Sequence, residues 1–345
     1  MSRQRVRVLV VDDSAFARKV VRESLELSPH IEVVGIARDG LDALEKIADL
    51  APDVITLDLV MPNLDGLGVL QALQGLPGRP VVVVVSMADE DSELGVAALA
   101  TGAFEVVKKP TALAIDRLYD LGDGLRATVL AAAEPSARRR SRPPPSRPPR
   151  RLVRKGDTQL VVISASTGGP QAITALLRAL PARFPVPLAV VVHMPLGYTE
   201  AFAQRLDAAC DLDVLEARDG LPLRPGLAII ARAGAHLVVT AAEGQGWACR
   251  LDAQPDSAPH RPSVDALFES AAREAKNGTL GVVLTGMGAD GRQGAGAIRA
   301  AGGRVFTESE SSCVVYGMPR SVVDAGFSDA QSTIEGMAAL IQENL

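Results

Sequence analysis

Short runs of valine, isoleucine and leucine alternate with helical patterns along most of this 345-residue chain. In the first part of the chain the runs lie at residues 6–11, 32–37, 53–58, 80–85 and 104–107. Runs that are apolar on both faces are typical of parallel strands covered by helices on each side. The five runs therefore predict a doubly wound α/β domain built around a five-stranded parallel sheet.

The alternation stops between Glu134 and Arg151, where the chain reads PSARRRSRPPPSRPPRR. Proline is excluded from helix interiors and central strands, and arginines without an intervening acid repel one another. We therefore predict an extended, solvated linker that separates two domains. Docking of this segment on an acidic partner or on nucleic acid is the alternative to a plain spacer.

The charge of the chain is distributed unevenly. Its net charge is −5, and seven arginines lie between residues 138 and 151, so that subtracting them leaves −12 for the rest. Domains that bind nucleic acid generally need basic faces that neutralise phosphates. We therefore predict no nucleic-acid partner for the folded domains.

The alternation resumes after the linker, with apolar runs at 159–164, 188–193, 227–230, 236–239 and 279–286. Helical patterns near 170–180, 199–209, 263–276 and 289–301 lie between these runs. They predict a second doubly wound domain, a Rossmann-like three-layer α/β fold with a short antiparallel insertion around 227–252. The predicted division is a first domain at 1–130, a Pro/Arg-rich linker at 131–156 and a second domain at 157–345.

Signals for export or membrane insertion are missing from the sequence. The first apolar run has about six residues, which is too short for a signal peptide. No stretch approaches the roughly 20 apolar residues that span a membrane. The three cysteines, Cys210, Cys249 and Cys313, lack metal-ligand spacing and fit a reducing compartment. We predict a cytoplasmic protein.

Polar residues follow the strands of the first domain where a ligand is expected, at the carboxyl edge of the sheet. Asp12 and Asp13 follow the first run, Asp58 ends the third, Ser86 follows the fourth and Lys109 the fifth. Clustered carboxylates favour a hard cation such as Mg²⁺. Phosphoryl transfer to Asp58 would then have the metal, Lys109 and Ser86 stabilising the incoming oxygens. The alternative is that these aspartates only cap helices and open a turn.

The motifs VVDDS, LDLVMPNLDG, VS at 85–86 and KKP resemble the response-regulator receiver domain over residues 5–130. The resemblance implies a flavodoxin-like fold, Asp58 as phosphoacceptor and Asp13 as the main Mg²⁺ ligand beside Asp12. It also implies a histidine kinase as the phosphodonor. One position departs from the family pattern, because Val106 stands where receivers usually have an aromatic switch residue.

In the second domain, LVVISASTGGP places three hydroxyl residues where a strand gives way to a helix. They are Ser164, Ser166 and Thr167. The following glycines let the backbone approach a substrate, and a helix N-terminus favours an anion. A phosphate cradle and a nucleophilic serine are both compatible with this turn, but the cradle lacks the lysine of a P-loop and the GxGxxG spacing.

Two more strands of this domain end in residues that complete a hydrolase constellation. His193 ends the run at 188–193, and Asp290 follows a glycine-rich turn after the start of the run at 279–286. A nucleophilic serine needs a base and a carboxylate that orients the base, roles that Ser166, His193 and Asp290 would fill. Taken singly, His193 would be a strand-end histidine and Asp290 a helix cap.

Other residues are predicted to line the same cleft. Amide groups near Met287 and Gly288 would donate to an oxyanion, with Thr167 beside the nucleophile. His260 lies in HRPSVDALF, at the start of a predicted helix, and is expected to line the substrate cleft.

The motifs ASTGGP, HMPLGYTEAFAQRLD, HRPSVDALF, LTGMGADG and SCVVYGMPR, after a receiver and a linker, resemble the chemotaxis protein-glutamate methylesterase family, CheB. The resemblance covers nearly the whole chain. It implies hydrolysis of glutamyl methyl esters on methyl-accepting chemoreceptors, with glutamine deamidation, and the triad Ser166, His193 and Asp290. It also implies that the unphosphorylated receiver covers the active site and that phosphorylation by the chemotaxis kinase relieves the block.

The resemblance further implies contact with the membrane only through the receptors, and an esterase reaction that needs no cofactor. Two positions depart from the family pattern: Ser164 stands where the family usually has glycine, and Arg232 stands where proline is common.

Two alternative functions remain open at this point. One is an esterase of the same mechanism in another signalling pathway, and the other is a non-catalytic binding module in which STGGP holds an anion.

Overall fold

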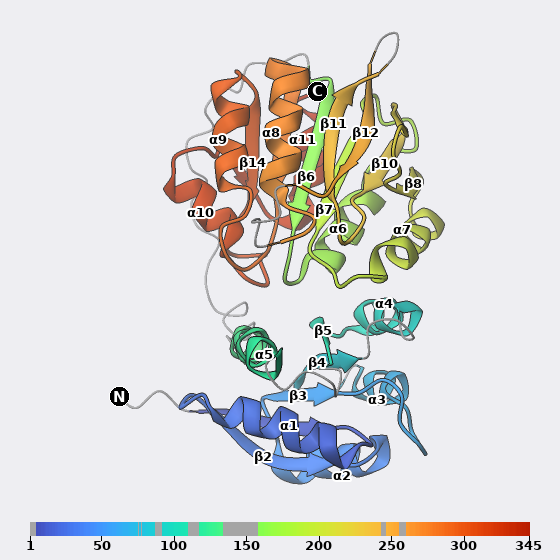
Figure 1. Ribbon diagram of the computed structural model, residues 1–345, viewed down its shortest axis with the longest axis vertical. Helices are drawn as coiled ribbons and strands as arrows, with labels where there is room; N and C mark the ends of the chain where they lie inside the picture. The colour runs from blue at the N-terminus through green and yellow to red at the C-terminus, as the bar shows by residue number, and fades with distance from the viewer. Residues whose placement is uncertain are drawn as a thin grey trace. The chain divides into compact units, whose positions relative to one another are not determined.

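The computed structural model describes residues 5–74, 76, 78–86, 92–109, 117–133, 158–242, 246–254 and 260–345. The chain divides into two compact units, Met1–Arg138 and Arg139–Leu345 (Figure 1). Most of the predicted linker, from residue 134 on, and Pro110 lie outside the described residues. Residues 131–133, which the sequence had assigned to the linker, are instead the end of a helix.

The first unit is the predicted five-stranded parallel sheet, with strand order β2-β1-β3-β4-β5. Its strands are β1 (Val6–Val11), β2 (Ile31–Ala37), β3 (Val54–Leu57), β4 (Val81–Ser86) and β5 (Glu105–Lys108). Its helices are α1 (Ala15–Glu26), α2 (Gly40–Leu50), α3 (Gly66–Leu73), α4 (Ser92–Thr101) and α5 (Arg117–Ala133). Each predicted apolar run became one strand, so the fold prediction for this unit is confirmed.

Aspartate and serine side chains begin the helices on the carboxyl side of this sheet. Ser14, Asp39 and Asp65 cap α1, α2 and α3, each accepting a hydrogen bond from the N–H three residues on. Helix α1 packs on α5, and their core side chains include Val21, Leu25 and Leu125.

The second unit is built on a seven-stranded parallel sheet with strand order β15-β14-β13-β6-β7-β10-β8. Its strands are β6 (Leu160–Ala165), β7 (Leu188–Val192), β8 (Asp213–Glu216), β10 (Leu227–Ile230), β13 (Thr279–Val283), β14 (Arg304–Glu308) and β15 (Ala330–Ser332). Its helices are α6 (Gly169–Arg178), α7 (Tyr198–Ala209), α8 (Val264–Ala275), the 3₁₀ turn η2 (Lys276–Gly278), α9 (Arg292–Ala300), α10 (Met318–Asp324) and α11 (Ile334–Gln342). The predicted parallel α/β class is confirmed here too.

The predicted antiparallel insertion at 227–252 was partly wrong. Residues 227–230 form β10, which pairs in parallel with β7 and β8 in the main sheet. The antiparallel sheet consists of β11 (His236–Ala241), β12 (Trp247–Asp252) and the short β9 (Pro222–Leu223). The run at 227–230 is buried at all four positions, as expected of a central parallel strand.

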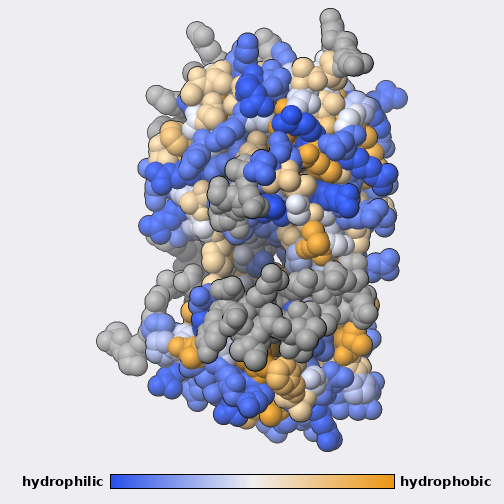
Figure 2. All heavy atoms as spheres, in the orientation of Figure 1, coloured by the Kyte–Doolittle hydropathy of each residue, from blue (hydrophilic) through white to orange (hydrophobic). Residues whose placement is uncertain are grey.

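On the face that Figure 2 shows, the described residues of each unit mix polar and apolar side chains, as is usual for globular domains. Among the helices in the described part of the chain, none is long and apolar enough to cross a membrane.

Candidate active site and phosphorylation site

Three aspartates gather at the carboxyl edge of the first sheet, as predicted. Asp12 and Asp13 follow β1 and Asp58 follows β3, and one carboxylate oxygen of each lies within 4.8 Å of the others. Asp12 and Asp58 are buried, whereas Asp13 is exposed. Oxygen ligands at this spacing fit a divalent cation that keeps some of its waters.

Lys109 lies between two of these carboxylates. Its Nζ is 2.5 Å from Oδ2 of Asp58 and 2.9 Å from Oδ2 of Asp12. The backbone N–H of Lys109 donates to the carbonyl of Ser86, 2.6 Å away, so the ends of β4 and β5 hold both residues at this edge. The structure thus brings together all five polar residues that the sequence placed here, with Ser86 fully buried.

Burial changes the pKa values of Asp58 and Lys109. It raises the pKa of Asp58, against the opposing effect of Lys109, and the charge of Asp12 raises it further. Burial alone would lower the pKa of Lys109, but its hydrogen bonds to Asp12 and Asp58 raise it above the ordinary value. Lys109 therefore stays charged beside Asp58, a position suited to stabilising added negative charge.

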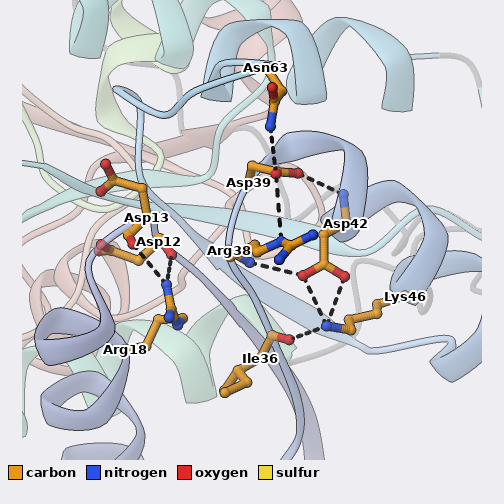
Figure 3. Close-up of polar contacts among 9 residues, drawn as sticks. All are labelled: Asp12, Asp13, Arg18, Ile36, Arg38, Asp39, Asp42, Lys46 and Asn63. Carbon is orange, nitrogen blue, oxygen red and sulfur yellow. Dashed lines mark hydrogen bonds and ion pairs between the residues drawn. The ribbon is translucent and has the colours of Figure 1, made fainter.

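Backbone contacts fix the β1–α1 loop (Figure 3). Arg18 donates from Nη1 to the carbonyls of Asp12, at 2.7 Å, and Asp13, at 3.0 Å. Asp12 also accepts the N–H of Ser14 through Oδ1, at 2.9 Å. These contacts leave Oδ2 of Asp12 facing Lys109.

The loop that carries Asp58 is fastened to the start of α2. Asn63, which has a positive φ of 65°, donates from Nδ2 to Asp39 Oδ2 at 2.9 Å (Figure 3). The N–H of Gly40 donates to the carbonyl of Leu64 at 3.0 Å. The sequence did not reveal this clamp, because Asp39 and Asn63 belong to separate loops.

The predicted nucleophile turn of the second unit, residues 166–168, follows β6. Ser166 is half-buried, and its backbone N–H donates to the carbonyl of Thr285, 2.9 Å away. Thr167 is buried, and Gly168 has a φ of 76°, where a Cβ would lie 2.5 Å from Val314. A residue with a side chain would not fit at Gly168, so the tight turn before α6 depends on glycine.

The two serines of the turn differ in availability. Ser164 lies within β6, is fully buried, and donates from Oγ to the carbonyl of Val282 at 3.3 Å. Ser166 follows the strand and, in the described part of the chain, its hydroxyl has no hydrogen-bond partner. Only the second hydroxyl is free to react.

Ser166 and His193 leave neighbouring strands at the same level. Ala165 pairs with Val192 in the β6–β7 ladder, and the N–H of His193 donates to the carbonyl of Ala165 at 3.1 Å. His193 Nε2 lies 3.0 Å from Oδ2 of Asp290. Its other nitrogen, Nδ1, is buried without a partner among the described residues.

Asp290 is anchored at the N-terminus of α8. It accepts the N–H groups of Val264, at 2.9 Å, and Asp265, at 3.0 Å, as well as the hydroxyl of Ser263 at 3.2 Å. Burial would raise the pKa of Asp290, but the hydrogen bonds from His193 and the two backbone groups lower it to about 2. The carboxylate is therefore ionised and held in one orientation toward His193.

His260 stacks on His193. The ring centroids are 4.3 Å apart and the planes differ by 25°. Partial desolvation of the ring and repulsion by His193 lower the pKa of His260, while Asp290 opposes the shift. The lowered pKa favours the neutral form of the His260 ring beside His193.

The loop after β13 approaches the nucleophile. A Cβ at Gly286 would lie 2.8 Å from Cβ of Ser166, so this loop passes directly beside the serine. Met287 is half-buried, and Gly288 is exposed with a φ of 83°. The sequence correctly placed this loop near the turn, but it did not indicate that backbone groups of α8 hold Asp290.

Comparisons with known proteins agree with this arrangement. The CheB methylesterase family matches residues 161–341, and the response regulator receiver domain matches residues 8–120. The chain is 58% identical to protein-glutamate methylesterase/protein-glutamine glutaminase 5 of Myxococcus xanthus, over 99% of this chain and 98% of that protein. It is 45% identical to the protein of the same type from Symbiobacterium thermophilum, over 93% and 92% of the two chains.

A solved structure supports the fold of the second unit. The catalytic domain of the Thermotoga maritima CheB methylesterase aligns with a TM-score of 0.53 and 39% identity, covering 55% of this chain and 99% of that one.

Proposed function

The chain belongs to the CheB methylesterase family, and we propose that it hydrolyses glutamyl methyl esters on methyl-accepting chemoreceptors under the control of its receiver domain. The membership confirms the family predicted from the sequence motifs. The names of the relatives support a second activity on the same receptors, deamidation of glutamine side chains.

The observation that carries the proposal is the pairing of His193 with Asp290. Nε2 of His193 donates to the ionised Asp290, which leaves the lone pair of Nδ1 to accept a proton. We infer that Nδ1 takes this proton from Ser166, because the two residues leave paired strands at the same level.

The reaction then follows acyl-transfer chemistry. Oγ of Ser166 attacks the ester carbonyl as its proton passes to His193, and the proton leaves with methanol when the C–O bond breaks. Water adds to the acyl-serine with His193 again acting as base, and the glutamate carboxylate is released. Deamidation would follow the same steps with ammonia as the leaving group.

We assign the negative charge of the tetrahedral intermediate to backbone donors near the serine. Candidates are the N–H groups of Thr167, Met287 and Gly288, since the loop after β13 passes beside Ser166. His260 covers one face of the His193 ring, which supports a position at the edge of the substrate cleft.

In the receiver, we propose that Asp58 accepts the phosphoryl group from the chemotaxis histidine kinase. Asp12, Asp13 and Asp58 would hold Mg²⁺, which when bound neutralises charge on the phosphoryl oxygens. Lys109 would stay paired with the phosphorylated side chain and Ser86 would donate to it. Phosphorylation is expected to raise esterase activity.

Methanol release from methylated chemoreceptor membranes tests the esterase assignment. We expect release by the wild-type chain and a loss of about 10⁴-fold or more in Ser166→Ala. Ser164→Ala is the matched control, since its hydroxyl is buried in β6. Wild-type methanol release by Ser166→Ala would overturn the role of Ser166 as nucleophile, and no release by the wild-type chain would favour a binding module in which the turn holds an anion.

A further inference from the structure

Glu308 is a buried carboxylate that the proposed reaction does not use. It ends β14, is 1% exposed, and lies at the edge of the sheet where Ser166 and His193 also lie. A buried carboxylate is unfavourable unless its oxygens find partners. Within the described part of the chain it forms no ion pair, and hydrogen-bond donors surround it instead.

The donors to Glu308 come from two different loops. Oε2 accepts the backbone N–H of Thr285 at 2.8 Å, and Oε1 accepts the hydroxyl of Ser312 at 2.8 Å. The thiol of Cys313 also hydrogen-bonds to it. Glu308 thus joins the loop after β13 to the loop after β14.

Thr285, which Glu308 holds, is in turn hydrogen-bonded to the nucleophile turn. Its carbonyl accepts the N–H of Ser166 at 2.9 Å, and its Oγ1 donates to the carbonyl of Thr167 at 3.0 Å. The same Oγ1 accepts the N–H of Val315 at 2.9 Å. A single residue held by Glu308 therefore contacts the backbone on both sides of the reactive serine.

Gly286, the residue after Thr285, is also held by hydrogen bonds, and it leads to the proposed oxyanion donors. The N–H of Gly286 donates to the carbonyl of Val315 at 3.0 Å, and its own carbonyl accepts the N–H of Met318 at 2.8 Å. Met287 and Gly288 follow directly, and a Cβ at Gly317 would lie 3.0 Å from the nitrogen of Gly288. Because Gly286 directly follows Thr285 in the chain, a shift of Thr285 would also move this loop.

We propose that Glu308 is a positioning residue for hydrolysis, which sets the distance between Ser166 and the oxyanion donors through its hydrogen bond to Thr285. The proposal rests on the proposed function of Ser166. The side chain must be long enough to reach from β14 to the N–H of Thr285, and we call this property its reach. Its charge is secondary. Catalysis is sensitive to such geometry, since a displacement of about 1 Å lowers rates by roughly 100-fold.

Protonation of Glu308 would change its charge without changing its reach. Burial raises the pKa of Glu308, hydrogen bonds from Ser312, Thr285 and Cys313 oppose the shift, and the nearby Glu335 of α11 raises it further. The titratable groups facing it are thus Cys313 and Glu335. A protonated carboxyl has one donor and one acceptor oxygen, so it can keep the bond from Thr285 as the amide of a glutamine can.

Two substitutions in the full-length chain separate reach from charge. Glu308→Gln keeps the reach, since its amide oxygen can accept from Thr285 while its NH₂ donates to Ser312. Glu308→Asp keeps the charge but is one methylene shorter. Glu310→Gln is the matched control, because Glu310 lies in the same loop and is exposed.

Two readouts are needed. One is kcat and KM for methanol release, and the other is the rate at which a small fluorophosphonate modifies Ser166, which requires no receptor. We expect Glu308→Gln to stay within about threefold of wild type, and Glu308→Asp to lose about 30-fold or more in kcat and probe rate with little change in KM.

Thermal unfolding would show that each variant is folded. Wild-type rates in Glu308→Asp, or an equal loss in Glu308→Gln and Glu308→Asp, would overturn the proposal. Failure of the proposed function has a different signature, because the wild-type chain itself would then release no methanol and its Ser166 would not react with the probe.

Discussion

His193 meets Asp290 through Nε2, 3.0 Å from Oδ2, and not through Nδ1. Nδ1 is buried without a partner among the described residues, and under the proposed mechanism it is the nitrogen that accepts the proton of Ser166. The carboxylate that sets this orientation is itself held by the first N–H groups of α8. The N-terminus of α8 thus orients the ring of His193, the proposed base, through one aspartate.

Asp290→Asn tests this orientation. An asparagine amide presents either a weaker acceptor or a donor to Nε2, so the imidazole would lose the tautomer that leaves Nδ1 unprotonated. We expect kcat to fall by about 10⁴-fold. Steady-state methanol release measures it, and a loss below about tenfold would contradict the role of the pair.

The low pKa of Asp290 predicts a pH-dependent stability of α8. Its pKa is lowered from 3.8 to about 2 in the folded chain, so its contribution is present above pH 4 and is lost as the pH falls toward 2. The contribution is about 2 kcal/mol. Amide exchange at Val264 and Asp265 should accelerate between pH 4 and 2 in the wild type, and a pH-independent protection there would count against it.

We expect His260 to support His193 by stacking on its ring, and not through its own ring nitrogens. His260→Phe keeps a flat ring against His193 and removes the titrating group, so we expect kcat to stay within about threefold. His260→Ala removes the stacking and should lower kcat by about tenfold. Because the pKa of His260 lies below its usual value, neither variant should change the profile above pH 7. An equal loss in both variants would instead assign a role to the imidazole nitrogens.

Lys109→Ala should uncouple the receiver from its phosphodonor. Lys109 is 2.5 Å from Asp58 and offsets the charge of the buried carboxylates. Its loss leaves Asp12 and Asp58 facing each other, so we expect phosphodonor to produce little or no rise in esterase activity, while the basal rate is retained. Full stimulation in Lys109→Ala would refute the role of the ion pair.

The polar residues at the strand ends could be predicted from the sequence. The hydrogen bonds that join one loop to another could not. Asp12, Asp58, Ser166 and His193 could be located because each follows a strongly apolar run, and such runs meet at one edge of a parallel sheet. The clamp from Asn63 to Asp39 joins loops 24 residues apart, and no local pattern marks it.

Strand β14 was not predicted from the sequence, for a related reason. Residues 304–308 form β14, yet RVFTE mixes polar and apolar side chains and lies between glycines and a serine-rich segment, so no strand was predicted there. Missing β14 also concealed Glu308, since its burial follows from its place at the end of that strand. Propensity alone does not identify a polar residue that is buried by long-range packing.

The most direct test of the account measures methanol release by the wild-type chain, Ser166→Ala and Asp58→Asn, each with and without Mg²⁺ and a small phosphodonor, on methylated receptor membranes. We predict release that rises with phosphodonor in the wild type, a basal rate that ignores phosphodonor in Asp58→Asn, and no release in Ser166→Ala. Methanol release that persists in Ser166→Ala, or no release by the phosphorylated wild type, would contradict the central claim that this chain is a phosphorylation-controlled serine esterase.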